Sequence, residues 1–428
     1  MKEQEKQKRA TMILIAGTFF NLSIGVLYIW GELKKVFMMP EASGGWGWTS
    51  TEAGLPYTLA IVFFAIGVLA GGRIQDKIGP RWVVTAGGFL VGLGLILSAF
   101  VGNNPMGVAL CYGVITGLGI GIGYSSVTPP ALKWFHPSKK GLVSGFTIGG
   151  FGFAAIFYAP LVASMLNRFY LQAGHEFAIE KTFLYLGIAV MAISMTVAQF
   201  VKNPPVDHAP IVPKNFKQKM IKPSIDFTWK EMIKTRQFFL ISFLFLFSAT
   251  VGLMIIGNTS KIAQIQAGIT NTALLLSLLA LMNGIGRLFG GIISDKIGRT
   301  NTLFVVLILQ MFNMIGFMFY SNLAGIIIGI IFAGLCFGTL LTVFPSMTAD
   351  RFGLKNYGAN YGIVYLFWGL AGIVAPVFAD HIFDLRGSFN IAYIICATMM
   401  PVLILVNYLL KKEINRADKL NIGIDSSW

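Results

Sequence analysis

Long apolar stretches alternate with short polar segments along the whole chain. A window of about 20 residues, the length of helix that crosses a bilayer, finds twelve of them. They cover residues 11–36, 52–74, 82–101, 106–128, 140–166, 182–201, 238–260, 271–294, 301–320, 323–347, 357–379 and 389–410. Since six lie on each side of one long polar segment, the pattern predicts an all-α membrane protein with twelve transmembrane helices in two groups of six.

The polar segment from Lys202 to Gln237 differs from every apolar stretch. It holds eight Lys/Arg residues and five prolines, and no bilayer span tolerates that combination. We therefore expect an N-terminal bundle over 1–201, a cytoplasmic linker over 202–237, a C-terminal bundle over 238–410 and a cytoplasmic tail over 411–428.

The two groups also share sequence. Residues 71–79 (GGRIQDKIG) return as residues 290–298 (GGIISDKIG) with seven of nine positions identical. Four further residues recur 217 positions later, namely Gly117, Phe135, Gly141 and Gly145 as Gly334, Phe352, Gly358 and Gly362. Such duplication is typical of secondary transporters, in which two bodies rock about a central site.

Composition and charge support a membrane protein. The chain is 55% hydrophobic and 12% charged, against about 25% charged in average soluble domains. With both termini cytoplasmic, 26 of the 33 Lys/Arg lie inside, 6 outside and 1 within a span. The positive-inside rule thus predicts cytoplasmic termini in the cell membrane. The net charge of +15 is spread over many short loops, which suits an anionic leaflet and argues against nucleic acid.

The repeated nonapeptide predicts a gate. Asp76 and Asp295 follow the ends of spans 2 and 8. A carboxylate there can accept hydrogen bonds from a neighbouring helix N-terminus and pair with basic residues, while glycines permit close packing and a tight turn. The predicted gating residues are Gly72, Asp76, Lys77, Gly79 and Arg81 in one copy and Gly291, Asp295, Lys296, Gly298 and Arg299 in the other.

Arg287 is the only Lys or Arg deep in a span, and no Asp or Glu lies deep in any span. An unpaired cation at mid-membrane costs about 2.5–3.5 kcal/mol on insertion scales, so the substrate is the expected counter-ion. A planar guanidinium holds a carboxylate through two hydrogen bonds. The alternative is that Arg287 bonds only to helix carbonyls or reaches the membrane interface.

Helical spacing adds candidates around Arg287. Asn283 lies four residues earlier on the same face of span 8, and Tyr365 and Trp368 share a face of span 11. Tyr28 and Tyr124 lie on similar polar-aromatic faces of spans 1 and 4. For each aromatic residue, interior packing or a membrane-interface belt is the competing interpretation. The four histidines and three cysteines lack metal-ligand spacing, so neither a metal nor a cofactor is expected.

The motif Gly-x-x-x-Asp-Lys-x-Gly-x-Arg, which ends at Arg81, resembles the signature loop of the major facilitator superfamily. More narrowly, five segments resemble the oxalate/formate antiporter family, relatives of the monocarboxylate transporters: 28–30, 117–124, 133–135, 283–287 and 360–362. The resemblance implies two pseudo-symmetric six-helix bundles and carboxylate-facing tyrosines at Tyr28 and Tyr124.

Two departures from that family narrow the expected substrate. Oxalate-exchanging members carry a lysine on span 11 where this chain has Trp368, so one cation remains and a monocarboxylate is the better charge match. Proton-coupled monocarboxylate transporters often carry an aspartate where this chain has Asn283, which cannot carry a proton. A proton can still travel on the substrate or through Glu32 or Asp380, so exchange and proton symport both stay open.

These observations predict a monomeric secondary transporter, not an enzyme, for a small monocarboxylate such as lactate, pyruvate or formate. Arg287 would bind the carboxylate, Tyr28 and Tyr124 would donate hydrogen bonds to it, and Asn283, Tyr365 and Trp368 would shape the pocket. The alternatives are a dicarboxylate antiporter of the oxalate/formate type, an exporter of hydrophobic drugs and a non-transporting membrane sensor of the same fold.

Overall fold

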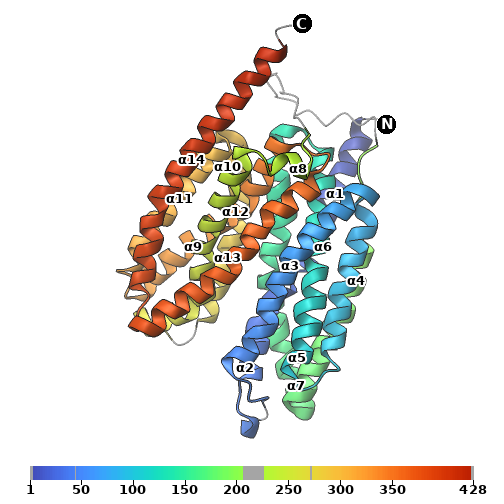
Figure 1. The fold of residues 1–428 in the computed structure, drawn as a ribbon. Helices are drawn as coiled ribbons and strands as arrows, with labels where there is room; N and C mark the ends of the chain where they lie inside the picture. Colours follow the sequence, from blue (N-terminus) through green and yellow to red (C-terminus); the bar gives the residue numbers. More distant parts are fainter. Residues whose placement is uncertain (1–2, 44, 206–225, 270–271, 426–428) are drawn as a thin grey trace.

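The computed structural model describes residues 3–43, 45–205, 226–269 and 272–425. All long regular elements within these residues are helices, and they form two bundles side by side (Figure 1). The N-terminal bundle contains α1 (Glu3–Ser23), η1 (Val26–Ile29), α2 (Trp30–Phe37), η2 (Glu41–Ser43), α3 (Ser50–Ile78), α4 (Pro80–Ser98), α5 (Pro105–Val108), η3 (Ala109–Thr116), α6 (Gly117–Trp134), η4 (Pro137–Lys139) and α7 (Lys140–Ala198).

The second bundle follows the linker, whose residues 206–225 lie outside the described part. The short helix α8 (Trp229–Met232) lies within the expected linker. The second bundle contains α9 (Arg236–Ala267), α10 (Ala273–Ile297), α11 (Arg299–Phe317), α12 (Leu323–Phe352), α13 (Tyr357–Arg386) and α14 (Asn390–Asp425). Because α14 continues past the last expected span, residues 411–425 of the expected tail prolong that helix.

The number of crossings depends on how α7 is counted. Eleven helices in the described residues are long and apolar enough to cross a membrane. Helix α7 has 59 residues, about 90 Å at 1.5 Å per residue, which is far more than one crossing needs. Its backbone leaves the helical region at Ala173 and Gly174, where Gly174 has φ 86°. The two segments on either side of this break match two expected spans, so the prediction of twelve transmembrane helices in two bundles is confirmed.

Span 1 is interrupted near its middle, which brings Tyr28 into the interior. Helix α1 ends at Ser23, and η1 and α2 complete the crossing. The interruption coincides with a close approach to α7, since a side chain at Gly25 would collide with Ala154. Tyr28 lies in η1 and packs against Phe151 of α7, with 5.7 Å between the ring centroids.

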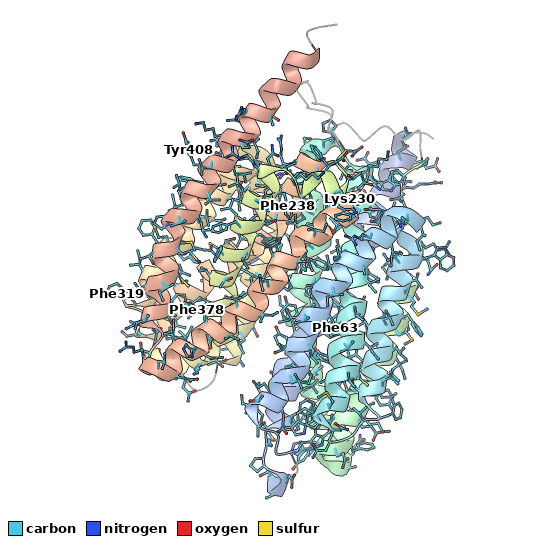
Figure 2. The ribbon with its side chains drawn as sticks, in the orientation of Figure 1. Phe63, Lys230, Phe238, Phe319, Phe378 and Tyr408 are labelled. Carbon is cyan, nitrogen blue, oxygen red and sulfur yellow. The ribbon has the colours of Figure 1, made fainter. Side chains whose placement is uncertain are left out.

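Side chains on the outer surface are largely apolar (Figure 2). Phe319 is 73% exposed and Tyr408 is 63% exposed. A soluble monomer rarely shows such extended apolar surface, whereas lipid chains solvate it at no cost. The surface therefore agrees with a multi-pass membrane protein.

The most extensive contacts between the bundles are those of α7 with α10 and of α3 with α13, and α7 also contacts α12. Helix α1 begins and α14 ends on the same side of the molecule (Figure 1), which we call the chain-end side. Glycines there let the backbones meet. A side chain at Gly291 would collide with the carbonyl of Gly141, and one at Gly72 would collide with the carbonyl of Gly358. The nonapeptide of each bundle thus contacts the other repeated segment in the opposite bundle: Gly72 meets Gly358, and Gly291 meets Gly141.

Candidate functional site: a buried arginine, an aromatic chamber and a gate

Arg287 lies in the interior of the bundle interface and is 2% exposed. It is on α10, and Nε donates to Asn283 Oδ1 at 3.0 Å. Its Nη1 donates to the carbonyl oxygen of Ile148 on α7 at 2.8 Å. Both acceptors are neutral, and no carboxylate in the described residues bonds to the guanidinium. The positive charge is therefore hydrogen-bonded but not neutralised.

The close approach of α7 to Arg287 follows from small residues. A Cβ atom at Gly152 would lie 3.0 Å from Arg287 Nε and 3.1 Å from Cδ. A side chain at Gly145 would meet the carbonyl oxygen of Arg287 at 2.6 Å. The glycines of span 5 thus bring α7 of the N-terminal bundle close to Arg287 of the C-terminal bundle. The Ile148 carbonyl can then accept a hydrogen bond from the guanidinium.

A cluster of aromatic rings packs beside the guanidinium, and we call this cluster the aromatic chamber. Arg287 Cζ lies 5.9 Å from the ring centroid of Phe151. Phe151 contacts Tyr124 at 5.6 Å and Phe64 at 5.7 Å between centroids. These contacts join Arg287 to rings from five helical elements (η1, α3, α6, α7 and α13): Tyr28, Phe64, Tyr124, Phe151, Tyr365 and Trp368.

The predicted substrate-binding residues therefore lie together. Tyr365 is next to Tyr124 at 5.7 Å and next to Trp368 at 4.8 Å between centroids. Tyr124, Tyr365 and Trp368 are buried, whereas Tyr28 is half-buried. Trp368 Nε1 and Tyr361 Oη are buried with no hydrogen-bond partner in the described residues. Since buried polar groups are normally paired, these two donors are available to a polar ligand.

Sequence reasoning missed Phe64 and Phe151, which connect the chamber. Phe151 lies in the segment Gly149-Gly150-Phe151-Gly152, whose glycines are typical of a helix-packing surface rather than of a ligand site. The one available signal was a single large ring within a run of glycines. Phe64 gave no signal because it is one of 36 phenylalanines in an apolar chain.

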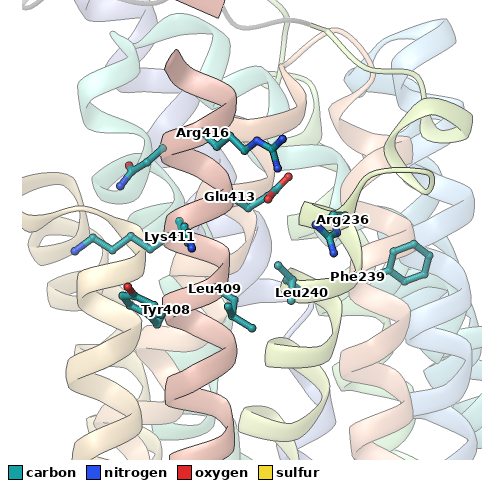
Figure 3. Close-up of a pocket in the computed structure, with 10 residues that line it drawn as sticks. Arg236, Phe239, Leu240, Tyr408, Leu409, Lys411, Glu413 and Arg416 are labelled. Carbon is teal, nitrogen blue, oxygen red and sulfur yellow. The ribbon is translucent and has the colours of Figure 1, made fainter. Parts of the chain in front are cut away.

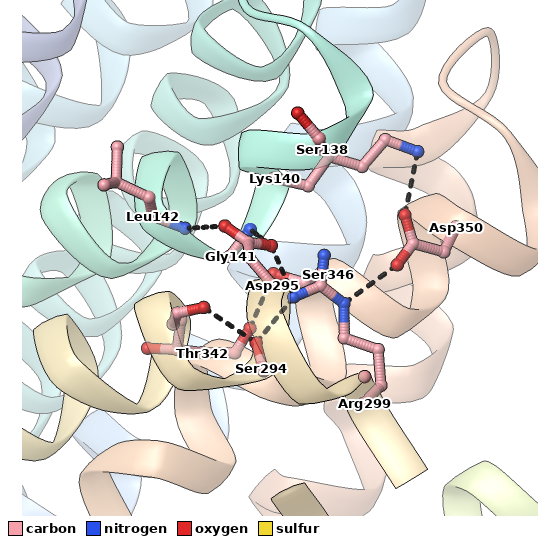
Figure 4. Close-up of polar contacts among 12 residues, drawn as sticks. Ser138, Lys140, Gly141, Leu142, Ser294, Asp295, Arg299, Thr342, Ser346 and Asp350 are labelled. Carbon is pink, nitrogen blue, oxygen red and sulfur yellow. Dashed lines mark hydrogen bonds and ion pairs between the residues drawn. The ribbon is translucent and has the colours of Figure 1, made fainter. Parts of the chain in front are cut away.

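The residues of the predicted gate in the second repeat hold α10 against the start of α7 (Figure 4). The two carboxylate oxygens of Asp295 accept from the backbone N–H groups of Gly141 and Leu142, each at 2.8 Å. Arg299 Nη1 pairs with Asp295 at 2.7 Å, and Arg299 Nε pairs with Asp350 at 2.8 Å. Lys140 Nζ completes the cluster at 3.1 Å from Asp350.

The gate of the first repeat holds α3 against the start of α13. Asp76 accepts from the backbone N–H groups of Gly358 at 3.2 Å and Ala359 at 2.9 Å. In both gates a carboxylate meets a helix N-terminus, where unpaired N–H groups and the helix dipole favour negative charge. Both sets of hydrogen bonds are present in the structure, and they tie the two bundles together on the chain-end side.

The basic residues of the two gates differ in position. Arg299 directly follows Gly298, whereas Pro80 separates Arg81 from Gly79. Because each residue advances a helix by about 100°, the extra residue points the Arg81 side chain in another direction than that of Arg299. Arg81 Nε donates to Gln199 at 2.7 Å. Lys77 and Lys296 are exposed and make no ion pair with either gate aspartate in the described residues.

Gly79 and Gly298 close the helices that carry the gate aspartates. Their φ angles are 87° and 93°, a region that L side chains avoid. Each glycine allows the chain to turn directly from one span into the next. The gate aspartates are thereby fixed three residues before a sharp reversal of the chain.

The other acidic residues near the spans are paired elsewhere. Glu32 accepts from Lys35 at 2.8 Å, and Asp380 pairs with Lys261 at 3.5 Å. Neither contacts the aromatic chamber through a described interaction. The described residues also contain no cluster of three or more His, Cys, Asp or Glu that could hold a metal ion.

The fold and the repeated gates define a secondary-transporter architecture. The model of the Major Facilitator Superfamily matches residues 10–344 and 313–426, and the chain belongs to this superfamily of transporters. An uncharacterized MFS-type transporter of Escherichia coli, YhjX, is 28% identical over 87% of this chain and 88% of its own length. The oxalate:formate antiporter of Oxalobacter formigenes is 30% identical over 75% of this chain and 72% of its own length.

A solved structure shows the same fold. The fucose:proton symporter FucP of Escherichia coli superimposes with a TM-score of 0.69, covering 94% of this chain and 98% of FucP. The sequences are 14% identical, so this likeness concerns the architecture alone.

Proposed function

We propose that the chain carries a small monocarboxylate, such as lactate, pyruvate or formate, across the cell membrane by alternating access. The observation that supports this most directly is the buried Arg287, whose two described partners are neutral oxygens. A guanidinium that keeps its charge in a low-dielectric interior attracts an anion strongly. The oxalate:formate antiporter, at 30% identity, is a relative whose name includes such an anion.

The geometry suggests how the carboxylate is held. It would replace the Ile148 carbonyl on Arg287 and accept two parallel N–H donors of the guanidinium. Tyr28 and Tyr124 would donate their hydroxyls, while Asn283 would keep Nε oriented. Tyr365 and Trp368 would enclose the apolar part of the substrate. Because the chamber provides one cation, a single carboxylate balances its charge.

The orientation of the protein is part of the proposal. The excess of Lys and Arg at the chain-end side favours a cytoplasmic location for both termini. The described structure, with both Asp76 and Asp295 bonded, then corresponds to a carrier closed toward the cytoplasm. Opening toward the cytoplasm requires both carboxylates to release the starts of α13 and α7.

Oxalate exchange is the second candidate, because the antiporter of Oxalobacter formigenes is 30% identical. A dianion needs a second cation beside Arg287. The family lysine on span 11 would supply it, but this chain has Trp368 at that position. Uptake of oxalate at a rate similar to that of formate would favour this candidate over the first.

The test is uptake into proteoliposomes of labelled formate, lactate, pyruvate and oxalate, with and without a pH gradient. We expect uptake of monocarboxylates. Arg287→Ala should abolish it, and Arg287→Lys should reduce it about 10- to 150-fold, since a hydrogen bond to a charged group contributes about 1.5–3 kcal/mol. Arg168→Ala removes an exposed cation and is the matched control. Normal uptake by correctly inserted Arg287→Ala protein would refute the proposal.

A further inference from the structure

A groove opens between α9 and α14 on the chain-end side (Figure 3). Its volume is about 1000 Å³, which is enough for the headgroup of a lipid and the adjoining part of its acyl chains. Its lining residues come from the start of α9 and the second half of α14, and Arg287 is not among them. The described residues that line it are Arg236, Phe239, Leu240, Tyr408, Leu409, Lys411, Lys412, Glu413, Asn415 and Arg416.

The lining is strongly basic. Four cations and one carboxylate line the groove, which gives a formal charge of 4 − 1 = +3. Arg236 comes from α9, whereas Lys412 and Arg416 come from α14, so both walls contribute positive charge. Lys411 is partly engaged elsewhere, because its Nζ donates to Asn301 at 2.8 Å. No ion pair of Arg236 or Arg416 with Glu413 is present within 4.0 Å in the described residues.

The two walls are held at a fixed separation by Arg351 of α12. Its Nη2 pairs with Asp418 of α14 at 2.9 Å. Its Nε donates to Gln237 of α9 at 3.3 Å. Arg351 therefore bridges the helices that form the groove, so the two walls are held together although their positive charges repel each other.

The same groove has an apolar part. Phe239 is 62% exposed and Leu409 is 44% exposed. Tyr408, whose ring and hydroxyl suit the boundary between lipid chains and headgroups, is 63% exposed. Cations and exposed apolar side chains together match a ligand with a phosphate at one end and hydrocarbon at the other.

We propose that this groove binds an anionic phospholipid, with its phosphate between Arg236 and Arg416 and its chains along Phe239, Tyr408 and Leu409. The charge of +3 and the apolar rim favour this occupant over a free phosphate, which would use the cations alone. The bound lipid would link α9 to α14 within the C-terminal bundle. The site is separate from Arg287, so its test does not depend on the proposed transport activity.

The experiment measures lipid binding by intact-protein mass spectrometry of the purified full chain in an uncharged detergent. Dioleoylphosphatidylglycerol and dioleoylphosphatidylcholine are added to the protein in parallel titrations, and their binding is compared. We expect tighter binding of phosphatidylglycerol. Arg236→Gln and Arg416→Gln should each weaken it about fivefold, and the double variant about 25-fold, because each basic side chain near an anionic lipid contributes a similar increment.

The matched control is Lys6→Gln/Lys8→Gln, which removes two cations from α1 on the same side of the molecule. It should bind phosphatidylglycerol like the unmodified protein. Equal binding of both lipids, or unchanged binding by the double variant, would overturn the proposal. Displacement of the lipid by millimolar inorganic phosphate would assign the groove to a free phosphate and would also overturn it. Both arginines are exposed at the surface, and the single variants provide a separate test if the double variant does not fold.

Discussion

Replacing Asn283 by aspartate would place a carboxylate beside the guanidinium of Arg287. In the structure, Asn283 Oδ1 accepts from Arg287 Nε at 3.0 Å, so the isosteric Asn283→Asp change requires no repacking. Two opposite unit charges about 4 Å apart attract by about 4 kcal/mol at an effective dielectric constant of about 20. If half of this, about 2 kcal/mol, opposes the substrate carboxylate, the KM rises about 30-fold.

The same substitution should make uptake depend on protons. Only the protonated form of the introduced carboxyl leaves the guanidinium free, so uptake by Asn283→Asp should rise as the pH falls. Below the range in which the carboxyl titrates, the KM should approach that of the unmodified protein. The assay is initial uptake of a labelled monocarboxylate into proteoliposomes across a pH series.

Asn283→Ala is the matched control, because it removes the acceptor without adding a charge. Asn283→Ala should lower the affinity for the monocarboxylate, and the size of this loss should not depend on pH. A KM of Asn283→Asp equal to that of the unmodified protein at neutral pH would refute the reasoning. It would mean that Arg287 does not face Asn283 when substrate binds.

Three further changes test other parts of the site. Trp368→Lys should strengthen competition by oxalate and weaken monocarboxylate uptake, because the chamber would then hold two cations; unchanged oxalate competition would contradict the charge argument. Asp295→Asn should increase hydrogen exchange at the start of α7 more than Asp76→Asn increases it at the start of α13, because the charge on Asp295 also anchors the ion-paired cluster. Equal effects would contradict this asymmetry. Gly152→Ala should raise the KM, since its Cβ would lie 3.0 Å from Arg287 Nε and would displace the guanidinium; an unchanged KM would show that the guanidinium has room to move.

The sequence was sufficient for those features that are local along the chain. Hydropathy identifies each span from its own residues, and the repeated nonapeptide reveals the duplication without any knowledge of contacts. The position of Asp295 after a span, followed by Arg299, predicted both a helix N-terminus as partner and a basic neighbour. In the structure the carboxylate bonds to Gly141 and Leu142 and pairs with Arg299.

Features that depend on which helices meet could not be predicted. The pairing of α7 with α10 decides that Arg287 reaches the carbonyl of Ile148, and nothing in residues 140–198 alone indicates it. The role of Phe151 in the chamber depends on the same pairing. The difference between Arg81 and Arg299 was present in the sequence as one inserted proline, but its effect appears only when the helix is built and the side chain turns away.

The pairing of α7 with α10 carries both the gate and the candidate substrate site. Arg287 and Asp295 are eight residues apart on α10, and Leu142 and Ile148 are six residues apart on α7, which places the two sites about 9–12 Å apart along the helices. On the proposed function, a substrate carboxylate displaces the Ile148 carbonyl and removes one of the hydrogen bonds between the bundles. The hydrogen bonds that then remain between α7 and α10 in the described residues are those of Asp295 with Gly141 and Leu142. In this proposal, substrate binding breaks the hydrogen bond between Arg287 and Ile148, and the hydrogen bonds of Asp295 break in the later opening step. Occupancy of Arg287 is thereby linked to movement of the bundles.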